Sequence, residues 1–359
     1  MFQVVHRKSL MKRYGCSFNR ANRRHDRLDP ISQISRTLTL RVAIIGYGTI
    51  GRLVSKALQN NSAFTVTRVI DRNPEAAEAG ARDMNIAAWS RDPADAFRFS
   101  NVDAVVIATP HADHAELTTS ALYHRKHVFL QPPVALRSPE AFRILSMAKH
   151  SGLVVAMDYW TRSAPAIRFA RGKIPRPTFI QIESVVDPLK DTWAGEAVHG
   201  GVLAYTGNHA LDLACYLAAS RPTHVQASGG RHTRRSGLAD TISAAIRFAN
   251  GSLARVIVGE FGHSQTFSSW RLLTADAIGT VTATNNLRNA VSFENGQSTS
   301  ADKCVGVARE ASCTRSLTAF ANAVAGNGRP LADITDGARA VQLADAMYEA
   351  MVSGNRIKL

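Results

Sequence analysis

Three glycines form the most recognisable chemical pattern in the chain. Gly46, Gly48 and Gly51 follow the apolar run 42–45 and open a segment whose apolar residues recur at helical spacing. In such a strand-turn-helix unit the first glycine permits a tight turn, the second lets the backbone approach a pyrophosphate, and the third lets helix and strand pack closely. The helix N-terminus then faces the phosphates. The pattern predicts a dinucleotide-binding turn with contacts from Gly46, Gly48, Thr49, Ile50 and Gly51.

An acidic residue follows this turn at the expected separation. The run 64–70 is rich in β-branched residues and leads to Asp71, about 20 positions after Gly51. A carboxylate at this point accepts hydrogen bonds from the adenosine ribose and repels a 2′-phosphate, so the sequence favours NAD. The neighbouring Arg72 is suited to receive that phosphate, which leaves NADP open.

Two further apolar runs, 102–110 and 127–130, flank a helical pattern and predict the next strand, helix and strand of a parallel sheet. Open parallel sheets bind ligands at the carboxyl ends of their strands. We therefore expect a cofactor-facing set after these runs, made of Thr109, Pro110, His111, His114, Gln131 and Pro132. For His114, capping or packing in the following helix is an equal alternative.

The pattern changes after about residue 155, where strand-helix alternation gives way to β-runs with hairpin signals. Asn-Gly pairs at 250–251 and 295–296 favour type I′ hairpin turns. Two helical patterns between 316 and 351 are expected to pack as framework. Strands are predicted at 178–186, 223–229, 242–248, 270–284 and 290–293.

These elements predict an α/β protein with two sheets. The first is a doubly wound parallel sheet of the Rossmann type over 41–156, and the second is the largely antiparallel open sheet of an α+β domain over 157–359. Helices are expected on one face of the second sheet, with the other face free. The segment 1–40 is expected to be a disordered basic extension.

Composition and cysteine usage exclude several classes of protein. With 45% hydrophobic and 20% charged residues and no apolar run near the ~18 residues that a membrane span needs, the chain is expected to have no membrane partner. Its four cysteines form no CxxC pair or Cys/His array, so neither a disulfide framework nor a metal site is expected. These features and the missing secretory signal predict a cytoplasmic protein.

The formal charge of +15 is concentrated at one end of the chain. Residues 1–41 contain ten Lys and Arg against only Asp26 and Asp29, which leaves +8 there and +7 in the remainder. A start codon placed too early, with Met11 as another candidate, and an Arg-rich transit peptide are alternatives to a disordered extension. Because charge must cluster on a folded surface to attract phosphate, no nucleic-acid partner is expected.

The order of motifs resembles the glucose-fructose oxidoreductase / inositol dehydrogenase / rhizopine-catabolism oxidoreductase family over residues 41–359. The resemblance implies a hydride transfer between NAD(P) and a hydroxyl or carbonyl of a sugar, cyclitol or other small polar substrate. It also implies a homo-oligomer formed through the second sheet. Besides the glycine turn, its carriers are ATPHADHAEL at 108–117, HVFLQPPVAL at 127–136, GGVLAYTGNHALDL at 200–213 and RPLADITDG at 329–337.

The chain departs from this family at two catalytic signatures. Members usually carry Glu-Lys-Pro where this chain has Gln131, Pro132 and Pro133, and Pro132 offers neither charge nor proton. Members also carry an aspartate four residues before a histidine, and here Tyr205 precedes His209. His209 is the expected acid/base because imidazole suits proton transfer near neutral pH.

The neighbours of His209 have more than one reading. In a helix, Tyr205 would share its face, and the two side chains are expected to relay a proton or orient the substrate. Asp212, three residues beyond His209, is placed to orient the ring. Packing of both His209 and Tyr205 on a half-buried helix is the alternative. Substrate contacts are expected from residues near the family's substrate segments, namely Tyr159, Arg162, Trp193 and Asn208.

Arg162 suits a bidentate clamp on a carboxylate or phosphate, although a solvated surface position is an alternative, as is a core position for Trp193. Two other functions stay open at this point. The altered Glu-Lys-Pro centre is compatible with reduction of imines or conjugated bonds. Loss of both family side chains is compatible with a catalytically degenerate, NAD(P)-binding regulatory protein.

Overall fold

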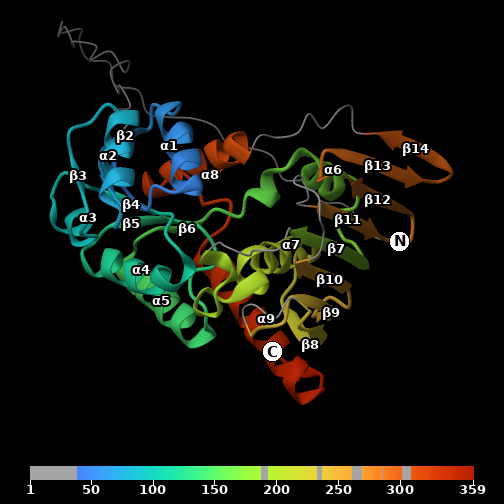
Figure 1. Ribbon diagram of the computed structural model, residues 1–359. Coiled ribbons are helices and arrows are strands. Elements are labelled where there is room, and N and C mark those ends of the chain that lie inside the picture. The colour runs from blue at the N-terminus through green and yellow to red at the C-terminus, as the bar shows by residue number, and fades with distance from the viewer. Residues whose placement is uncertain (1–38, 187–192, 233–236, 261–268, 285, 301–308) are drawn as a thin grey trace, which may run out of the picture. The chain divides into compact units, whose positions relative to one another are not determined.

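The computed structural model describes residues 39–186, 193–232, 237–260, 269–284, 286–300 and 309–359 (Figure 1). These residues belong to one structural unit, Leu38–Leu359. Nearly all of the basic segment 1–40 lies outside them, as do Cys16 and Cys304, so the expectations for that segment stay predictions.

Six parallel strands form the first sheet, in the order β3-β2-β1-β4-β5-β6. The strand order reverses between β1 and β4, which is the switch point where doubly wound sheets bind ligands. Both strands are almost wholly buried because helices cover both faces. The predicted Rossmann-type sheet is confirmed. Its strands are β1 Leu40–Ile45, β2 Phe64–Ile70, β3 Trp89–Ser90, β4 Ala104–Ile107, β5 His127–Leu130 and β6 Val155–Met157.

The connections of this sheet run through helices that begin near the carboxyl ends of the strands. Residues 46–48 join β1 to α1, and residues 108–110 join β4 to a short helix η1. These two connections flank the switch point. The helices are α1 Thr49–Gln59, α2 Pro74–Asp83, α3 Ala94–Arg98, η1 His111–Asp113, α4 His114–Tyr123 and α5 Ser138–Ser151.

Nine strands form the second sheet, in the order β14-β13-β12-β11-β7-β10-β9-β8-β15. The largely antiparallel sheet is confirmed, with β10 and β7 as a parallel pair. Along β9, buried residues alternate with more exposed ones, as expected for a sheet with one uncovered face. Its strands are β7 Phe179–Val186, β8 Pro222–Gly230, β9 Thr241–Phe248, β10 Leu253–Glu260, β11 Ser269–Ala275, β12 Gly279–Thr284, β13 Asn289–Glu294, β14 Gln297–Ser300 and β15 Ile357–Lys358.

The two Asn-Gly pairs adopt different turns. Asn295 and Gly296 both have positive φ, of 51° and 79°, as a type I′ turn requires. The prediction of the same turn at 250–251 is wrong, because only Gly251 has positive φ. The side chain of Asn250 accepts hydrogen bonds from Ser252 and donates one to the carbonyl of Ala218, which stabilises a different conformation.

The helices of the second part do not all stay with the second sheet. Helix α8 packs beside α1 (Figure 1). The ring of Phe320 on α8 lies 6.5 Å from that of Phe64 on β2 and 5.7 Å from that of Phe129 on β5. None of the described helices has the length and apolarity to cross a membrane. The helical segments are η2 Trp160–Ser163, α6 Pro165–Lys173, η3 Trp193–Gly195, η4 Ala197–His199, η5 Leu203–Gly207, α7 Asn208–Ala218, α8 Arg309–Val324 and α9 Ile334–Ser353.

Candidate functional site

The three glycines of the turn after β1 have different surroundings. Gly46 has φ of 93°, and a Cβ there would lie 2.6 Å from the carbonyl oxygen of Ala108. A Cβ on Gly51 would overlap the carbonyl oxygen of Gly46. By contrast, a Cβ on Gly48 would meet no atom within 4 Å. Gly46 and Gly51 are therefore required by packing, whereas the space at Gly48 is open to a ligand. The open backbone at Gly48 fits the expected approach of a diphosphate.

Asp71 lies directly beside this turn. Its Oδ2 accepts a 2.7 Å hydrogen bond from the backbone N–H of Tyr47, and its Oδ1 accepts one of 2.9 Å from Asn73. Arg72 extends instead to Asp113, with 2.6 Å between Nη2 and Oδ2. The acid expected to bind a ribose is thus at the turn, while the cation expected to bind a 2′-phosphate already has a carboxylate partner.

His114 connects the chain segments that follow β4 and β5. Its ring is fully buried, with Nδ1 at 2.7 Å from the carbonyl oxygen of Pro133 and Nε2 at 2.9 Å from that of Thr109. Burial lowers the pKa of His114, although the two carbonyls oppose this shift. Both ring nitrogens face main-chain oxygens, so His114 positions Thr109 and Pro133 and offers no free edge to a cofactor.

The Gln131 side chain points to an acid at the end of β6. Its Nε2 donates a 2.8 Å hydrogen bond to Oδ2 of Asp158, which is almost completely buried. Burial raises the pKa of Asp158. The adjacent Pro132 adds no donor. Asp158 was not among the predicted site residues. The only feature of the sequence that points to it is an acidic residue directly after the short apolar run 155–157.

Histidine and aromatic rings join the edge of the first sheet to the segments before α7. The ring of His111 is buried, with Nδ1 at 3.1 Å from the carbonyl oxygen of His199, and Trp193 packs edge-on against it at 4.8 Å. Tyr205 lies 6.3 Å from both His111 and Trp193. Burial lowers the pKa of His111 well below its ordinary value. His199 was also missed, because no local pattern links it to residue 111.

His209 lies in the first turn of α7 and faces the η2 segment. Its ring centroid is 5.6 Å from that of Tyr159 and 6.4 Å from that of Trp160. Burial, with a smaller contribution from the Arg309 cation, lowers the pKa of His209 to about 3. Its Nδ1 is enclosed and has no hydrogen-bond partner among the described residues. The ring is therefore a neutral imidazole with an enclosed nitrogen that has no partner among the described residues.

The expected pairing of Tyr205 with His209 does not form in this structure. Tyr205 belongs to η5, a π-helical turn, so the α-helical spacing of four residues does not apply. Tyr205 is 39% exposed and packs with His111 and Trp193, whereas His209 is buried against Tyr159 and Trp160. Among the described residues, no ring contact joins the two side chains.

Arg162 and Asp212 differ most from the expectations. Arg162 is buried and donates hydrogen bonds of 2.8 Å and 2.5 Å to the two carboxylate oxygens of Asp212. Its Nη1 also donates to the carbonyl of Leu331 and to Asp336. The guanidinium is thus occupied and unavailable as a substrate clamp. Asp212 for its part does not orient the ring of His209, because both of its oxygens are directed to Arg162.

The remaining predicted substrate residues divide into two groups. Tyr159 Oη donates a 2.6 Å hydrogen bond to Oδ1 of Asn208, and both side chains are buried, so they satisfy one another. Trp193 is 37% exposed and lies at the edge of the site. In the described part of the chain, no three His, Cys, Asp or Glu side chains are grouped so that they could hold a metal ion.

Comparisons with known proteins agree with this geometry. A family model described as an oxidoreductase family with an NAD-binding Rossmann fold matches residues 40–159, and a model of the GFO/IDH/MocA C-terminal domain matches residues 168–272. scyllo-Inositol 2-dehydrogenase (NAD(+)) of Bacillus subtilis (strain 168) is 26% identical over 67% of this chain and 72% of its own length.

Two further proteins extend the similarity over most of the chain. Inositol 2-dehydrogenase of Rhizobium meliloti (strain 1021) is 24% identical and covers 90% of this chain and 100% of its own length. The solved structure of a levoglucosan dehydrogenase in complex with NADH has a TM-score of 0.82 at 19% identity. It covers 89% of this chain and 98% of its own, and shows that the two share a fold.

Proposed function

The chain belongs to the GFO/IDH/MocA family of NAD-binding oxidoreductases, and from this we propose that it transfers a hydride between NAD and a hydroxyl or carbonyl group of a sugar or cyclitol. His209 is the group that takes or returns the hydroxyl proton. The observation that carries this proposal is the position of the neutral His209 imidazole, which lies in the first turn of α7 beside Tyr159 and Trp160.

The turn at 46–51 and Asp71 fit the dinucleotide. The backbone at Gly48 is open to a diphosphate, and the Asp71 carboxylate stands beside the same turn. The amides at the start of α1 are oriented to donate to phosphate oxygens. When bound, the nicotinamide supplies or accepts the hydride. Because Arg72 is paired with Asp113, the site favours NAD over NADP.

His209 is suited to the proton half of the reaction. Oxidation of an alcohol releases the hydroxyl proton as the hydride leaves carbon, and a neutral imidazole accepts that proton. Burial against Tyr159 and Trp160 keeps the ring uncharged and excludes water from it. In the reverse direction the imidazolium returns the proton to the new alcohol.

The proposed substrate class is inferred from the named relatives and from the two aromatic residues at the edge of the site. The relatives include dehydrogenases of scyllo-inositol and inositol. Trp193 and Tyr205 are partly exposed at the edge of the site, and aromatic faces of this kind pack against the C–H surface of a polyol while leaving its hydroxyls to polar groups.

Two other functions are favoured by one specific observation. Pro132 supplies no proton, and Tyr205 turns away from His209, so the site has fewer acid/base groups than the family signatures provide. A chain with this site is suited to reduce an imine or conjugated bond, or to bind the cofactor without turnover.

We further propose a homo-oligomer formed through the uncovered face of the second sheet. The interface is placed toward the β13 end of this sheet, where Val291 and Phe293 are 43% and 54% exposed. Large apolar side chains gathered on one open sheet are typical of an interface. No partner beyond the substrate and further copies of the chain is proposed.

A substrate panel separates these functions. The purified full chain is incubated with NAD and inositols, monosaccharides and anhydro sugars, or with NADH and their ketones, imines and conjugated carbonyls, and the absorbance of NADH is followed. The expected result is turnover of a polyol. His209→Asn should then lower kcat by about 10²-fold or more while NADH binding persists.

The other outcomes would favour a different function or a different role for His209. Turnover of imines or conjugated bonds alone would favour the reductase. Tight NADH binding without turnover across the whole panel would favour the regulatory protein. A His209→Asn variant as active as the parent enzyme would refute the role given to His209.

A further inference from the structure

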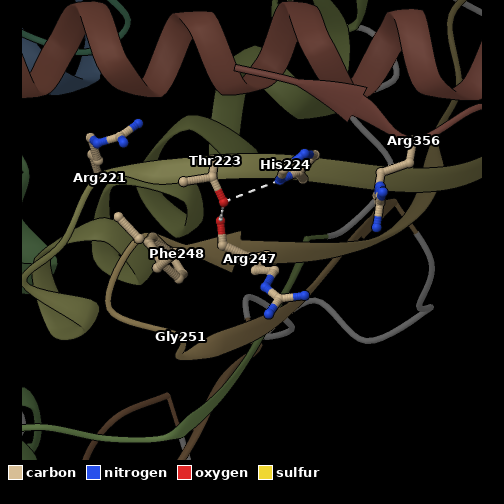
Figure 2. A pocket seen from close by; sticks show the side chains of 8 residues that line it. Arg221, Thr223, His224, Arg247, Phe248, Gly251 and Arg356 are labelled. Atoms are coloured by element: carbon tan, nitrogen blue, oxygen red, sulfur yellow. Dashed lines mark hydrogen bonds between the residues drawn. The ribbon is translucent and has the colours of Figure 1, made fainter.

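A cavity lies in the second sheet, where β8, β9 and β15 are neighbours, and shares no residue with the site described above. Its volume is about 370 Å³. Figure 2 shows its lining, with arginines contributed by three separate segments of the chain. The lining residues are Arg221, Thr223, His224, Arg247, Phe248, Ala249, Gly251 and Arg356.

The charged residues that line this cavity are all basic. Arg221 precedes β8, Arg247 lies on β9 and Arg356 precedes β15, and no acidic residue lines the space they share. None of these three guanidinium groups has a carboxylate or hydrogen-bond partner within the described parts of the chain. By comparison, Arg162 and Arg72 are both held by acids. We refer to this cavity as the arginine pocket.

The sheet register brings further basic side chains to this face. His224 pairs directly with Arg247 on one side and with Lys358 on the other. Directly opposite residues of antiparallel strands project on the same face, with Cβ atoms about 4.5–5.5 Å apart. The Arg247 and Lys358 side chains therefore flank His224 on that face.

Local hydrogen bonds hold the pocket in shape. Thr223 Oγ1 donates a 3.0 Å hydrogen bond to the carbonyl of Arg247, and His224 Nδ1 lies 3.2 Å from the same hydroxyl (Figure 2). Since the Thr223 proton is used, Nδ1 of His224 is the donor in this contact and Nε2 stays free. The N–H of Ala249 donates to the carbonyl of Arg221 at 2.9 Å, which joins the residue after β9 to the residue before β8.

From these observations we propose that the arginine pocket binds the phosphate group of a small phosphorylated metabolite. Guanidinium groups bind phosphate oxygens in pairs of parallel hydrogen bonds, and several of them around one concavity raise the local concentration of anions. A cavity of this volume suits a phosphomonoester or diphosphate, whereas a nucleic-acid backbone needs an extended track of charge. The proposal is independent of the chemistry at His209.

The test uses the full chain in its own oligomeric state, saturated with NADH so that the glycine turn is filled. Calorimetric titrations with pyrophosphate, AMP and glucose 6-phosphate, in buffer without phosphate, separate the inorganic, nucleotide and sugar-phosphate sources. At least one probe should bind saturably. Arg247→Gln, and the double variant Arg221→Gln/Arg356→Gln, should each weaken that binding by about tenfold or more, with the melting temperature unchanged.

Two controls make the result specific. Arg255→Gln removes an exposed arginine on the neighbouring strand β10 and should leave the affinity unchanged. Arg247→Lys keeps the charge but loses the paired donors, and should fall between the parent protein and Arg247→Gln.

Several outcomes would overturn the proposal. One is no saturable binding of any probe at millimolar concentration. Another is equal weakening by Arg255→Gln, which would mean diffuse charge. Binding of a single-stranded oligonucleotide without binding of the small phosphates would point to a different class of ligand.

Discussion

Arg162 and Asp212 form a buried, two-pronged ion pair that joins the η2 segment to helix α7, with N–O distances of 2.8 Å and 2.5 Å. Burial raises the pKa of Asp212 to about 6, against the opposing pull of Arg162. For Arg162, burial acts to lower the pKa, but Asp212 and Asp336 outweigh it and raise the pKa. The pair is therefore a framework contact, made by an α7 residue three positions beyond His209.

Removal of one partner should destabilise the fold. Arg162→Met leaves an unpaired carboxylate in the interior and should lower the free energy of unfolding by about 3–5 kcal/mol, measured by urea denaturation. Replacing both, as Arg162→Met/Asp212→Leu, should recover most of the loss. Arg271→Met, which breaks an exposed pair with Glu183, is the control and should change stability by less than about 1 kcal/mol. If Arg162→Met raised KM at unchanged stability, Arg162 would be a substrate clamp after all.

The glycines of the turn should respond differently to substitution by alanine. Gly48 has φ of −74° and open surroundings, so Gly48→Ala should fold normally. Its new methyl group would occupy the path of the diphosphate, and we expect the Kd for NADH to rise by about tenfold or more. Gly51→Ala should instead lower the melting temperature, because its Cβ overlaps the Gly46 carbonyl. Unchanged NADH affinity in Gly48→Ala would place the diphosphate elsewhere.

Acid should destabilise the protein through its buried histidines. The pKa of His209 is about 3 in the folded chain and about 6.5 when unfolded, so between these values the unfolded chain binds the extra proton. Stability contributed by the neutral ring is present above pH 6.5 and is lost as the pH falls. At pH 5 the loss from His209 is about 2 kcal/mol. Urea denaturation at pH 7 and pH 5 should show a smaller pH effect in His209→Gln, and an equal effect would contradict this.

The preference for NADH over NADPH should depend on the ion pair between Arg72 and Asp113. The parent protein should bind NADH about tenfold or more tightly than NADPH, because Asp71 stands at the turn and Arg72 is paired with Asp113. Asp113→Asn releases Arg72 and should improve NADPH binding, as measured by fluorescence titration. The same substitution combined with Arg72→Gln should show no gain. A gain in that double variant would remove Arg72 from the explanation.

The open face of the second sheet should govern oligomerisation. Val291→Lys/Phe293→Lys places charge on exposed apolar positions of that face and should shift the protein to smaller species in light scattering after gel filtration. Val352→Lys, at a position 91% exposed near the end of α9, is the matched control and should leave the mass unchanged. Equal masses for all three proteins would mean that this face is not the interface.

Local pattern was sufficient to predict the two sheets and the glycine turn. Strand and helix periodicities depend on neighbouring residues, so the runs leading into Gly46 and Asp71 predicted β1 and β2, and the spacing between them indicated a turn with an acid beside it. The resemblance then added His209 as the proton-transfer group. That role stays a proposal, although the structure places the ring in a buried position against Tyr159 and Trp160.

The partners of long side chains were decided by the tertiary structure alone. Arg162 meets Asp212 across 50 positions, and His111 meets the carbonyl of His199 across 88, so no local period encodes either contact. The π-helical turn at Tyr205 likewise rotates that ring away from the face that an α-helix would give it. Sequence by itself therefore determined which elements form and where the dinucleotide turn lies. Packing of distant segments decided which charged groups are neutralised and which are left free to bind a ligand, because burial makes an unpaired charge costly.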